Sequence, residues 1–396
     1  MNFPKGFIWG TAISAHQTEG NDTNCDWWEW EKDKPDDRQF PLEPSGVACD
    51  SYNRYSEDFD LCKELNNNAV RISLPWNRIE PGEGRFNRSE IEHYRKVLQA
   101  AKDRGLKTFV TLHHFTNPLW FAGKGGWTNF KSPQYFKNYA KKCAKEFGGL
   151  VDAFLTINEP QVYALMSYTN GMWPPNKRNY FLSLIVQINL LRAHIDAYKA
   201  IKSVGNFTVG LVKNIVWFEP HPTEATFLDK AICKFLYFLN CDLFLKPIGK
   251  NIDLLGLNYY FTTRISHGRV KNLDDVISDL GWWINPMGLE KILLDLKRFK
   301  FPIYITENGI ADAKDIRRKK FIHDMLVSCY KAIAKGVDLR GYFHWTLIDN
   351  YEWHQGFWPK FGLVEIDKKN GLARIPRKSF YYYANICKDN KIELQE

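Results

Sequence analysis

The sequence predicts an α/β fold in which eight parallel strands and their connecting helices form a closed (β/α)8 TIM barrel. Short apolar runs that favour β-structure alternate with longer segments of helical period, and eight such runs can be counted. No G-x-G-x-x-G motif occurs, although an open doubly wound sheet that binds dinucleotides usually has one after its first strand. The chain has 396 residues, 44% of them hydrophobic, and no linker rich in Pro, Gly or Ser. We therefore predict one barrel domain over residues 1–396.

The eight expected strands are distributed over the whole chain. The segments between them have helical period, as the crossover connections of parallel strands require. The predicted boundaries carry an error of about two to four residues. The expected strands are Phe7–Ala15, Ala69–Pro75, Thr108–His114, Asp152–Asn158, Thr208–Asn214, Ile252–Tyr259, Ile303–Glu307 and Arg340–Leu347.

Several connecting segments carry helix start and stop signals. Ser89 and Glu92 have the spacing of a capping box, and Gly105 is placed to end the helix that follows. Ser132 is predicted to be the N-cap of a later helix, with Pro133 at its first position. Strand, helix, strand is thus the recurring unit of the chain.

Composition and charge exclude several classes of protein. The net charge of +9 is spread along the chain and does not predict nucleic-acid binding, and the basic stretch Lys314–Lys320 is expected to be the solvated start of an amphipathic helix. The eight cysteines include no C-x-x-C pair, which argues against a zinc site. No apolar stretch approaches the roughly 18–20 residues that span a bilayer, and Met1–Gly10 lacks the pattern of a secretion signal. We expect a cytoplasmic protein with reduced thiols and no membrane partner; its oligomeric state is not predicted.

Two of the expected strands end in a glutamate. The fourth reads F-L-T-I-N-E-P and delivers Glu159, and the seventh reads I-Y-I-T-E-N-G and delivers Glu307. The active face of such a barrel lies at the C-terminal ends of its strands, and strands four and seven lie nearly opposite each other. Cleavage of a glycosidic bond needs one carboxylic acid and one carboxylate on opposite sides of the bond. Arg71, which closes the second strand, is the candidate cation that keeps one carboxylate ionised.

Other polar and aromatic residues at strand ends suit a sugar, which offers hydroxyl groups at its rim and C–H groups on its face. Amide, carboxylate and imidazole groups would bind the hydroxyls, and tryptophan rings would stack on the face. These candidates are Gln17, Glu19, His114, Asn258, Tyr260, Trp345, Glu352 and Trp353.

These segments resemble glycoside hydrolase family 1 from one end of the chain to the other. The resemblance rests on the opening segment Phe3–Ala12, on T-x-N-E-P and on T-E-N-G. It implies a retaining β-glycosidase, a β-glucosidase or β-galactosidase, that removes terminal β-linked glucose or galactose from small glycosides without a metal or organic cofactor. It further implies the following residue roles: Glu159 as acid/base, Glu307 as nucleophile, Asn158 at the sugar 2-hydroxyl, Arg71 and Tyr260 against the nucleophile, Gln17, His114, Trp345, Glu352 and Trp353 around the glycone, and Phe361 at its edge.

Some alternatives stay open at this point. A 6-phospho-β-glycosidase or a transglycosidase could use the same barrel, although Glu352 stands where phosphate-binding members have serine. A sugar-binding barrel without catalysis would gain nothing from two opposed carboxylates. A metal-dependent isomerase would need clustered ligands, and His16 and His113 have no third ligand at helical or strand spacing. Phe115 stands where the family usually has tryptophan.

Overall fold

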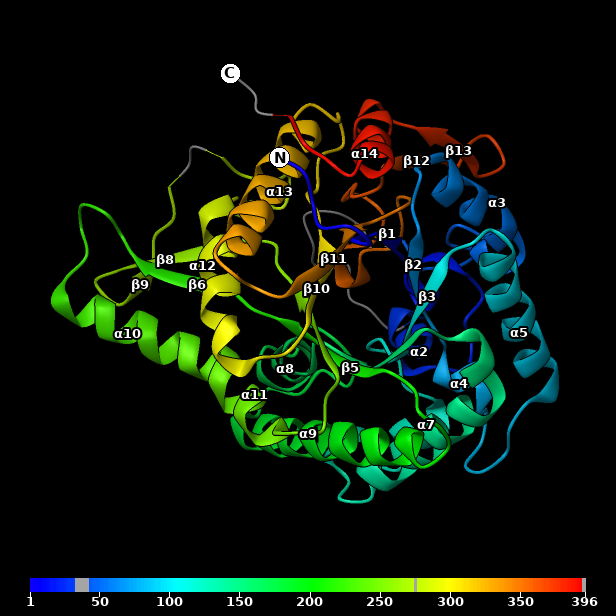
Figure 1. Ribbon diagram of the computed structural model, residues 1–396. Coiled ribbons are helices and arrows are strands. Elements are labelled where there is room, and N and C mark those ends of the chain that lie inside the picture. The colour runs from blue at the N-terminus through cyan, green and yellow to red at the C-terminus, as the bar shows by residue number, and fades with distance from the viewer. Residues whose placement is uncertain (33–42, 274–275, 394–396) are drawn as a thin grey trace.

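A computed structural model describes residues 1–32, 43–273 and 276–393 and confirms the predicted barrel. Eight parallel strands close in the order β1-β11-β10-β7-β5-β4-β3-β2, with helices around them (Figure 1). Every predicted strand is present and its boundaries lie within three residues of those expected. The strands are β1 (Ile8–Ala12), β2 (Ala69–Ser73), β3 (Lys107–His113), β4 (Ala153–Asn158), β5 (Val209–Asn214), β7 (Leu254–Asn258), β10 (Ile303–Asn308) and β11 (Leu339–Trp345).

The barrel strands are buried on both faces, which explains their nearly continuous apolar sequences. One set of side chains, including Ile8, Phe109, Leu155 and Phe343, fills the inside of the barrel. A much larger set packs between the outside of the strands and the surrounding helices. Polar residues of these strands therefore lie mainly toward the strand ends.

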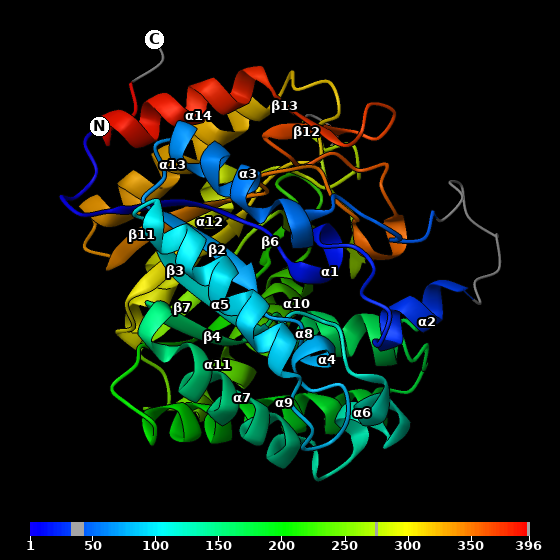
Figure 2. The same ribbon diagram turned by 90° about the vertical axis from the view of Figure 1, so that its right-hand side faces the viewer.

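Helices cover the outside of the barrel, and α7 and α9 lie side by side along one edge (Figures 1 and 2). Among the described helices, none is long and apolar enough to cross a membrane. The helices are α1 (Ala15–Thr18), α2 (Asp26–Lys32), α3 (Ser51–Glu64), α4 (Trp76–Ile79), α5 (Arg88–Asp103), α6 (Leu119–Gly123), α7 (Ser132–Phe147), α8 (Pro160–Ala164), α9 (Tyr180–Lys202), α10 (Phe227–Tyr237), α11 (Leu243–Ile248), α12 (Pro286–Leu296), α13 (Arg318–Ala334) and α14 (Lys378–Asp389).

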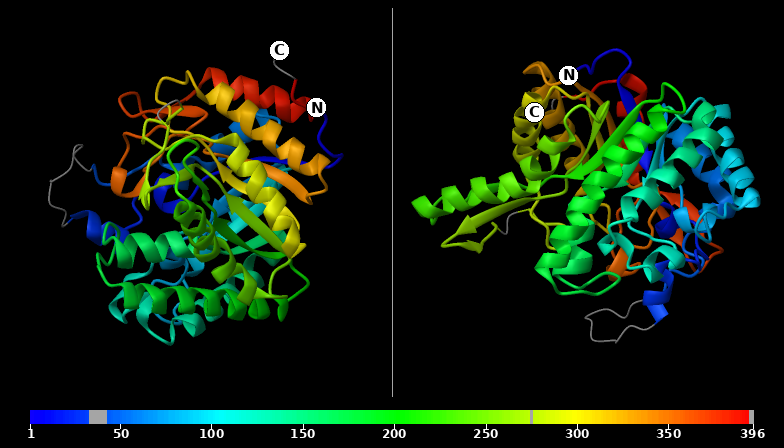
Figure 3. Two further views of the ribbon diagram at one scale, coloured as in Figure 1. Left: turned by 90° about the vertical axis from the view of Figure 1, so that its left-hand side faces the viewer. Right: turned by 90° about the horizontal axis from the view of Figure 1, so that it is seen from below.

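Two small sheets are additions to the barrel. The strands β6 (Trp217–Pro220), β8 (Thr262–Ser266) and β9 (Arg269–Val270) form one sheet, which projects from the barrel together with α10 (Figure 3). The strands β12 (Val364–Asp367) and β13 (Ala373–Pro376) form an antiparallel pair near α14 (Figure 2).

The predicted helix caps were wrong by one or two residues. The cap of α5 is Asn87, whose side chain accepts hydrogen bonds from the backbone N–H groups of Ser89 and Glu90, so the expected capping box at Ser89 is absent. In α7, Ser132 is already helical, and its hydroxyl donates to the backbone oxygen of Asn129 at 2.6 Å. In each case a polar residue just upstream takes part in the turn that starts the helix.

The basic stretch Lys314–Lys320, which runs into the first turn of α13, is not wholly solvated. Arg318 is fully buried and donates hydrogen bonds to the backbone oxygens of Asp312 and Lys360, each at 2.8 Å. Its charge is balanced by Asp315. The sequence count of basic residues could not separate this buried arginine from its exposed neighbours, because one of its partners, the backbone oxygen of Lys360, comes from a distant loop.

Candidate active site

The two glutamates predicted from the strand ends both lie at the C-terminal mouth of the barrel. Glu159 follows β4 and Glu307 lies in β10, and they are 7% and 3% exposed, respectively. The barrel order places only β5 and β7 between β4 and β10 on the shorter side. Two buried carboxyl groups in one site cannot ionise equally, because each charge disfavours the other.

Glu307 is held by a donor at each oxygen. Arg71 donates from Nη1 to Oε1 at 2.5 Å, and the hydroxyl of Tyr260 donates to Oε2 at 2.6 Å. Arg71 is only 1% exposed, and its Nη2 donates to Oδ1 of Asn158 at 2.7 Å. Donors of this kind stabilise the negative form of a carboxyl group. The environment of Glu307 is therefore that of a carboxylate.

Glu159 has the opposite environment. Burial and then the charge of Glu307 raise its pKa to about 8, although a hydrogen bond from Asn258 and the nearby charges of Arg71 and Lys213 work in the other direction. Nδ2 of Asn258 donates to Oε1 at 2.7 Å, and Asn258 is itself oriented by the hydroxyl of Thr306, also at 2.7 Å. Glu159 is thus a protonated acid at neutral pH beside a fixed carboxylate.

The backbone around the site adopts an uncommon conformation at three non-glycine residues. Glu159, Phe115 and Trp353 have φ values of 42°, 71° and 51°. Left-handed backbone costs of order 1–3 kcal/mol at such residues, and it persists where the surrounding fold holds it and a side chain must point a particular way. The backbone N–H of Glu159 is fixed by a hydrogen bond to the oxygen of Val212 at 2.9 Å.

The predicted glycone residues gather beside the two glutamates. Nε2 of Gln17 lies 3.4 Å from Oε2 of Glu352, and the Ser14 hydroxyl donates to Oε1 of Gln17 at 2.6 Å. The ring of His114 is nearly parallel to those of Trp353 and Trp345, with centroids 5.9 and 6.2 Å away.

Glu352 and His114 are the two ionisable groups among these glycone residues. Burial and the charges of Glu307 and Glu159 raise the pKa of Glu352 to about 8. Nε2 of His114 lies 3.3 Å from Nδ2 of Asn158, so Nε2 is the acceptor and the proton is on Nδ1. That Nδ1 is buried and has no hydrogen-bond partner within the described chain, which leaves a donor for a sugar hydroxyl.

Sequence reasoning missed two residues of the site. Lys213, in β5, is 1% exposed, and its charge acts on Glu159; a lysine near the end of an otherwise apolar strand was the available signal. Trp282 packs against Phe361 and Tyr260, with ring centroids 6.0 and 5.5 Å apart. It comes from a loop without a regular pattern, so no spacing in the sequence pointed to it.

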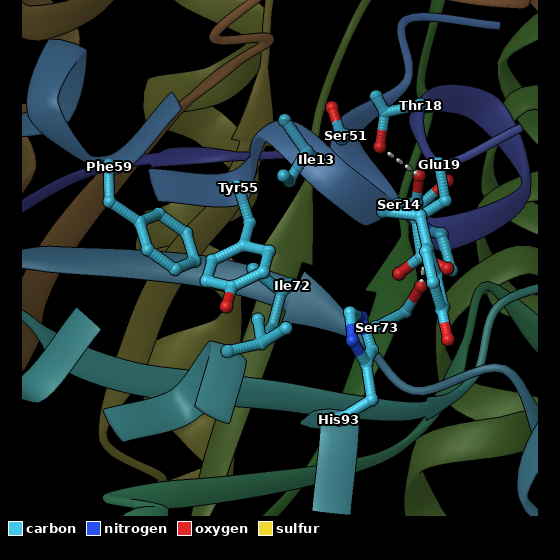
Figure 4. Close-up of a pocket in the computed structure, with 13 residues that line it drawn as sticks. Ile13, Ser14, Thr18, Glu19, Ser51, Tyr55, Phe59, Ile72, Ser73 and His93 are labelled. Atoms are coloured by element: carbon cyan, nitrogen blue, oxygen red, sulfur yellow. Dashed lines mark hydrogen bonds between the residues drawn. The ribbon is translucent and has the colours of Figure 1, made fainter. Parts of the chain in front are cut away.

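The prediction that Glu19 contacts the sugar is corrected by the structure, because Glu19 does not lie with the other predicted sugar-contacting residues. Its carboxylate accepts a hydrogen bond from Tyr94 of α5 at 2.6 Å and pairs with Arg78 at 3.5 Å. It lines a cavity of about 20 Å³, room for about one water, between α1, α3, α5 and β2 (Figure 4). Tyr55 and His93 also line this cavity, whereas Glu159, Glu307 and Gln17 do not.

Known proteins match nearly the whole length of this chain. The family model described as "Glycosyl hydrolase family 1" matches residues 1–250 and 242–392. The chain is 32% identical to β-glucosidase A of Thermotoga maritima, over 99% of each chain, and 28% identical to a β-galactosidase of Pyrococcus woesei, over 98% of each.

Solved structures of similar proteins share the barrel. A β-glycosidase from Pyrococcus horikoshii superimposes with a TM-score of 0.92 at 36% identity, covering 99% of this chain and 96% of that one. A Thermotoga maritima β-glucosidase in complex with glucoimidazole gives 0.93 at 30% identity, covering 99% and 100%.

Proposed function

This chain belongs to glycosyl hydrolase family 1 and is a retaining β-glycosidase, and on that basis we propose that Glu159 is its acid/base and Glu307 its nucleophile. The observation that carries the assignment is the asymmetry of the pair: Arg71 and Tyr260 donate to both oxygens of Glu307, whereas burial and the Glu307 charge raise the pKa of Glu159 to about 8.

The reaction proceeds in two displacements. In the first, an oxygen of Glu307 forms a bond to the anomeric carbon while the glycosidic bond breaks, and Glu159 gives its proton to the departing oxygen. Esterification removes the charge of Glu307, so the pKa of Glu159 falls and its carboxylate becomes a base. In the second, Glu159 takes a proton from water, the water oxygen bonds to the anomeric carbon and Glu307 leaves as a carboxylate. Two inversions give net retention.

We propose terminal β-linked glucose or galactose as the glycone. The donor Nδ1 of His114 and the paired Gln17 and Glu352 side chains supply the hydrogen-bonding groups that sugar hydroxyls need. Trp353 and Trp345 supply flat apolar surfaces, and Phe361 closes the edge. The relatives named β-glucosidase and β-galactosidase support the same pair of sugars.

Two further proposals concern the protein as a whole. Residues 1–396 form one catalytic domain, because the first strand of the barrel pairs with the last. The protein acts in the cytoplasm, where its eight buried and free cysteines would stay reduced.

The test is hydrolysis of a panel of aryl β-glycosides, with NMR observation of the first product formed. We expect release of β-configured glucose or galactose before mutarotation. Initial formation of the α-anomer would contradict the retaining assignment.

A further inference from the structure

A second cluster of reactive side chains lies beside the active site, at the start of the chain. His16 of α1, Asp22 of the following loop and Cys25, which precedes α2, bring Nδ1, Oδ2 and Sγ within 4.8 Å of one another. All three residues are at most 2% exposed. The sequence pattern predicted no third ligand near His16; the loop supplies two ligands, at spacings that neither a helix nor a strand would give.

Two of the three distances between the donor atoms of this cluster are close to those of a zinc site. Nε2 of His16 lies 2.9 Å from Oε1 of Glu31, a normal charge-assisted hydrogen bond. Nδ1 lies 3.3 Å from Oδ2 of Asp22 and 3.7 Å from Sγ of Cys25, and the Cys25 thiol also donates to the backbone oxygen of Asp22 at 3.1 Å. Atoms that bind one tetrahedral zinc at its usual bond lengths lie about 3.4 Å apart for N and O and about 3.6 Å apart for N and S.

The second carboxylate oxygens of Asp22 and Glu31 already have other polar partners. Oδ1 of Asp22 accepts from the side chain of Asn77 and lies 3.4 Å from Nε of Arg78. Oε2 of Glu31 accepts from the backbone N–H and the hydroxyl of Ser45, at 2.8 and 2.7 Å. A histidine that binds a metal typically donates from its other ring nitrogen to a carboxylate, and Glu31 is such a carboxylate.

We propose that His16, Asp22 and Cys25 bind a zinc ion through Nδ1, Oδ2 and Sγ. One imidazole, one thiolate and one carboxylate are the donor types that zinc takes, whereas Mg²⁺ and Ca²⁺ prefer oxygen alone. The thiolate and the two carboxylates carry three negative charges; zinc balances two of them, and Arg78, which also pairs with Glu19, lies beside Asp22. Binding displaces the thiol proton of Cys25 to solvent and leaves the His16 proton on Nε2.

The three side chains fill three of the four positions that zinc usually takes, and the site stands apart from the hydrolytic steps. It ties α1, which carries Gln17, to the start of α2. The ring of His16 is also nearly parallel to that of Trp353, with centroids 5.9 Å apart. A metal here would stiffen one wall of the glycone site and add stability to the folded state.

The experiment compares the natural sequence with Cys25→Ser and with a matched control, Cys62→Ser. Cys62 is equally buried, but it contacts Thr11 rather than this cluster. Each protein is stripped with a chelator, reloaded with zinc and passed through a desalting column. We expect about one zinc per chain and a higher Tm on reloading for the natural sequence and for Cys62→Ser, and loss of both for Cys25→Ser.

Cobalt(II) substitution supplies a readout that does not depend on a variant. Cobalt in this site should give the intense thiolate charge-transfer absorption and the visible bands of a tetrahedral ion. Absence of the thiolate band in the natural sequence would overturn the proposal even if Cys25→Ser fails to fold. Equal zinc binding by Cys25→Ser would also overturn it.

Discussion

At the scale of single residues, two side chains of the same type have different surroundings in one site. Glu307 accepts from a guanidinium and a phenol, whereas Glu159 accepts from the neutral amide of Asn258. The strand-end motifs were sufficient to predict both glutamates and Arg71. They could not predict that Asn258 holds the acid, or that Lys213 lies near it, because those contacts depend on the register of β7 and β5 with their neighbours.

The raised pKa of Glu159 predicts the alkaline limb of the pH profile. The acid must be protonated for the first displacement, so kcat/KM should fall about tenfold per pH unit above about 8. With an activated aryl leaving group, which needs no proton, Glu159→Ala should lack this limb. Glu352 has a pKa raised to about 8 as well; a limb unchanged in Glu159→Ala would assign it to that residue instead.

We predict that removal of the nucleophile changes the anomeric configuration of the product. Glu307→Gly should lose about 10⁴-fold or more in kcat, because no covalent intermediate can form. Azide or formate should fit the vacated space, attack the anomeric carbon directly and restore part of the rate with inverted product. NMR analysis of the product checks this, and the natural sequence with azide is the control. Unimpaired hydrolysis by Glu307→Gly would refute the role of this residue.

At the scale of elements, the hydrophobic period predicted all eight strands, but the helix starts were misplaced. Strand identity depends on many apolar side chains, whereas a cap depends on which one of several polar neighbours turns toward the backbone. Asn87, Ser89 and Ser132 were all acceptable caps by residue type. Only the local backbone selects Asn87 for α5 and leaves Ser132 inside α7.

The corrected cap of α5 predicts a difference between two alanine variants. Asn87→Ala should lower the free energy of unfolding by about 1 kcal/mol, because two backbone N–H groups lose their acceptor. Ser89→Ala should cost less, since its hydroxyl only donates to Oδ1 of Asn87. Urea unfolding midpoints measure both. A larger loss for Ser89→Ala would favour the capping box after all.

The close packing of Gly309, in the T-E-N-G segment, predicts that a side chain added after β10 displaces the end of β11. A Cβ on Gly309 would lie 1.8 Å from the backbone oxygen of Trp345, so the end of β11 must move to admit it. Gly309→Ala should lower stability by about 1–3 kcal/mol and weaken glycone binding through Trp345. Gly149→Ala, where a Cβ meets nothing within 4 Å, is the matched control. Equal stability and KM in the two variants would contradict the coupling.

At the scale of the whole molecule, the barrel and its family could be predicted because their signals extend along the entire chain. The pairing of β1 with β11 joins the two ends into one closed sheet. The projecting α10 and its small sheet carry no such signal, because their residues follow none of the barrel's repeating pattern (Figure 3). Only the structure shows that α10 and this sheet are present.

Because the barrel is a closed sheet, we predict that the protein unfolds as one cooperative unit. Thermal unfolding followed by far-UV and near-UV circular dichroism should give coincident transitions, because no strand of the barrel can leave without opening the sheet. Two separated transitions would contradict the proposal of a single domain.

Trapping the covalent intermediate tests whether Glu307 becomes bonded to the sugar during turnover. A 2-deoxy-2-fluoro-β-glucoside with a good leaving group slows the second displacement more than the release of that group, so the glycosyl-enzyme accumulates. Peptide mass spectrometry after brief incubation should locate one fluorosugar on the carboxyl group of Glu307. A label on any other residue, or inactivation without a covalent label, would contradict the role of Glu307 as nucleophile.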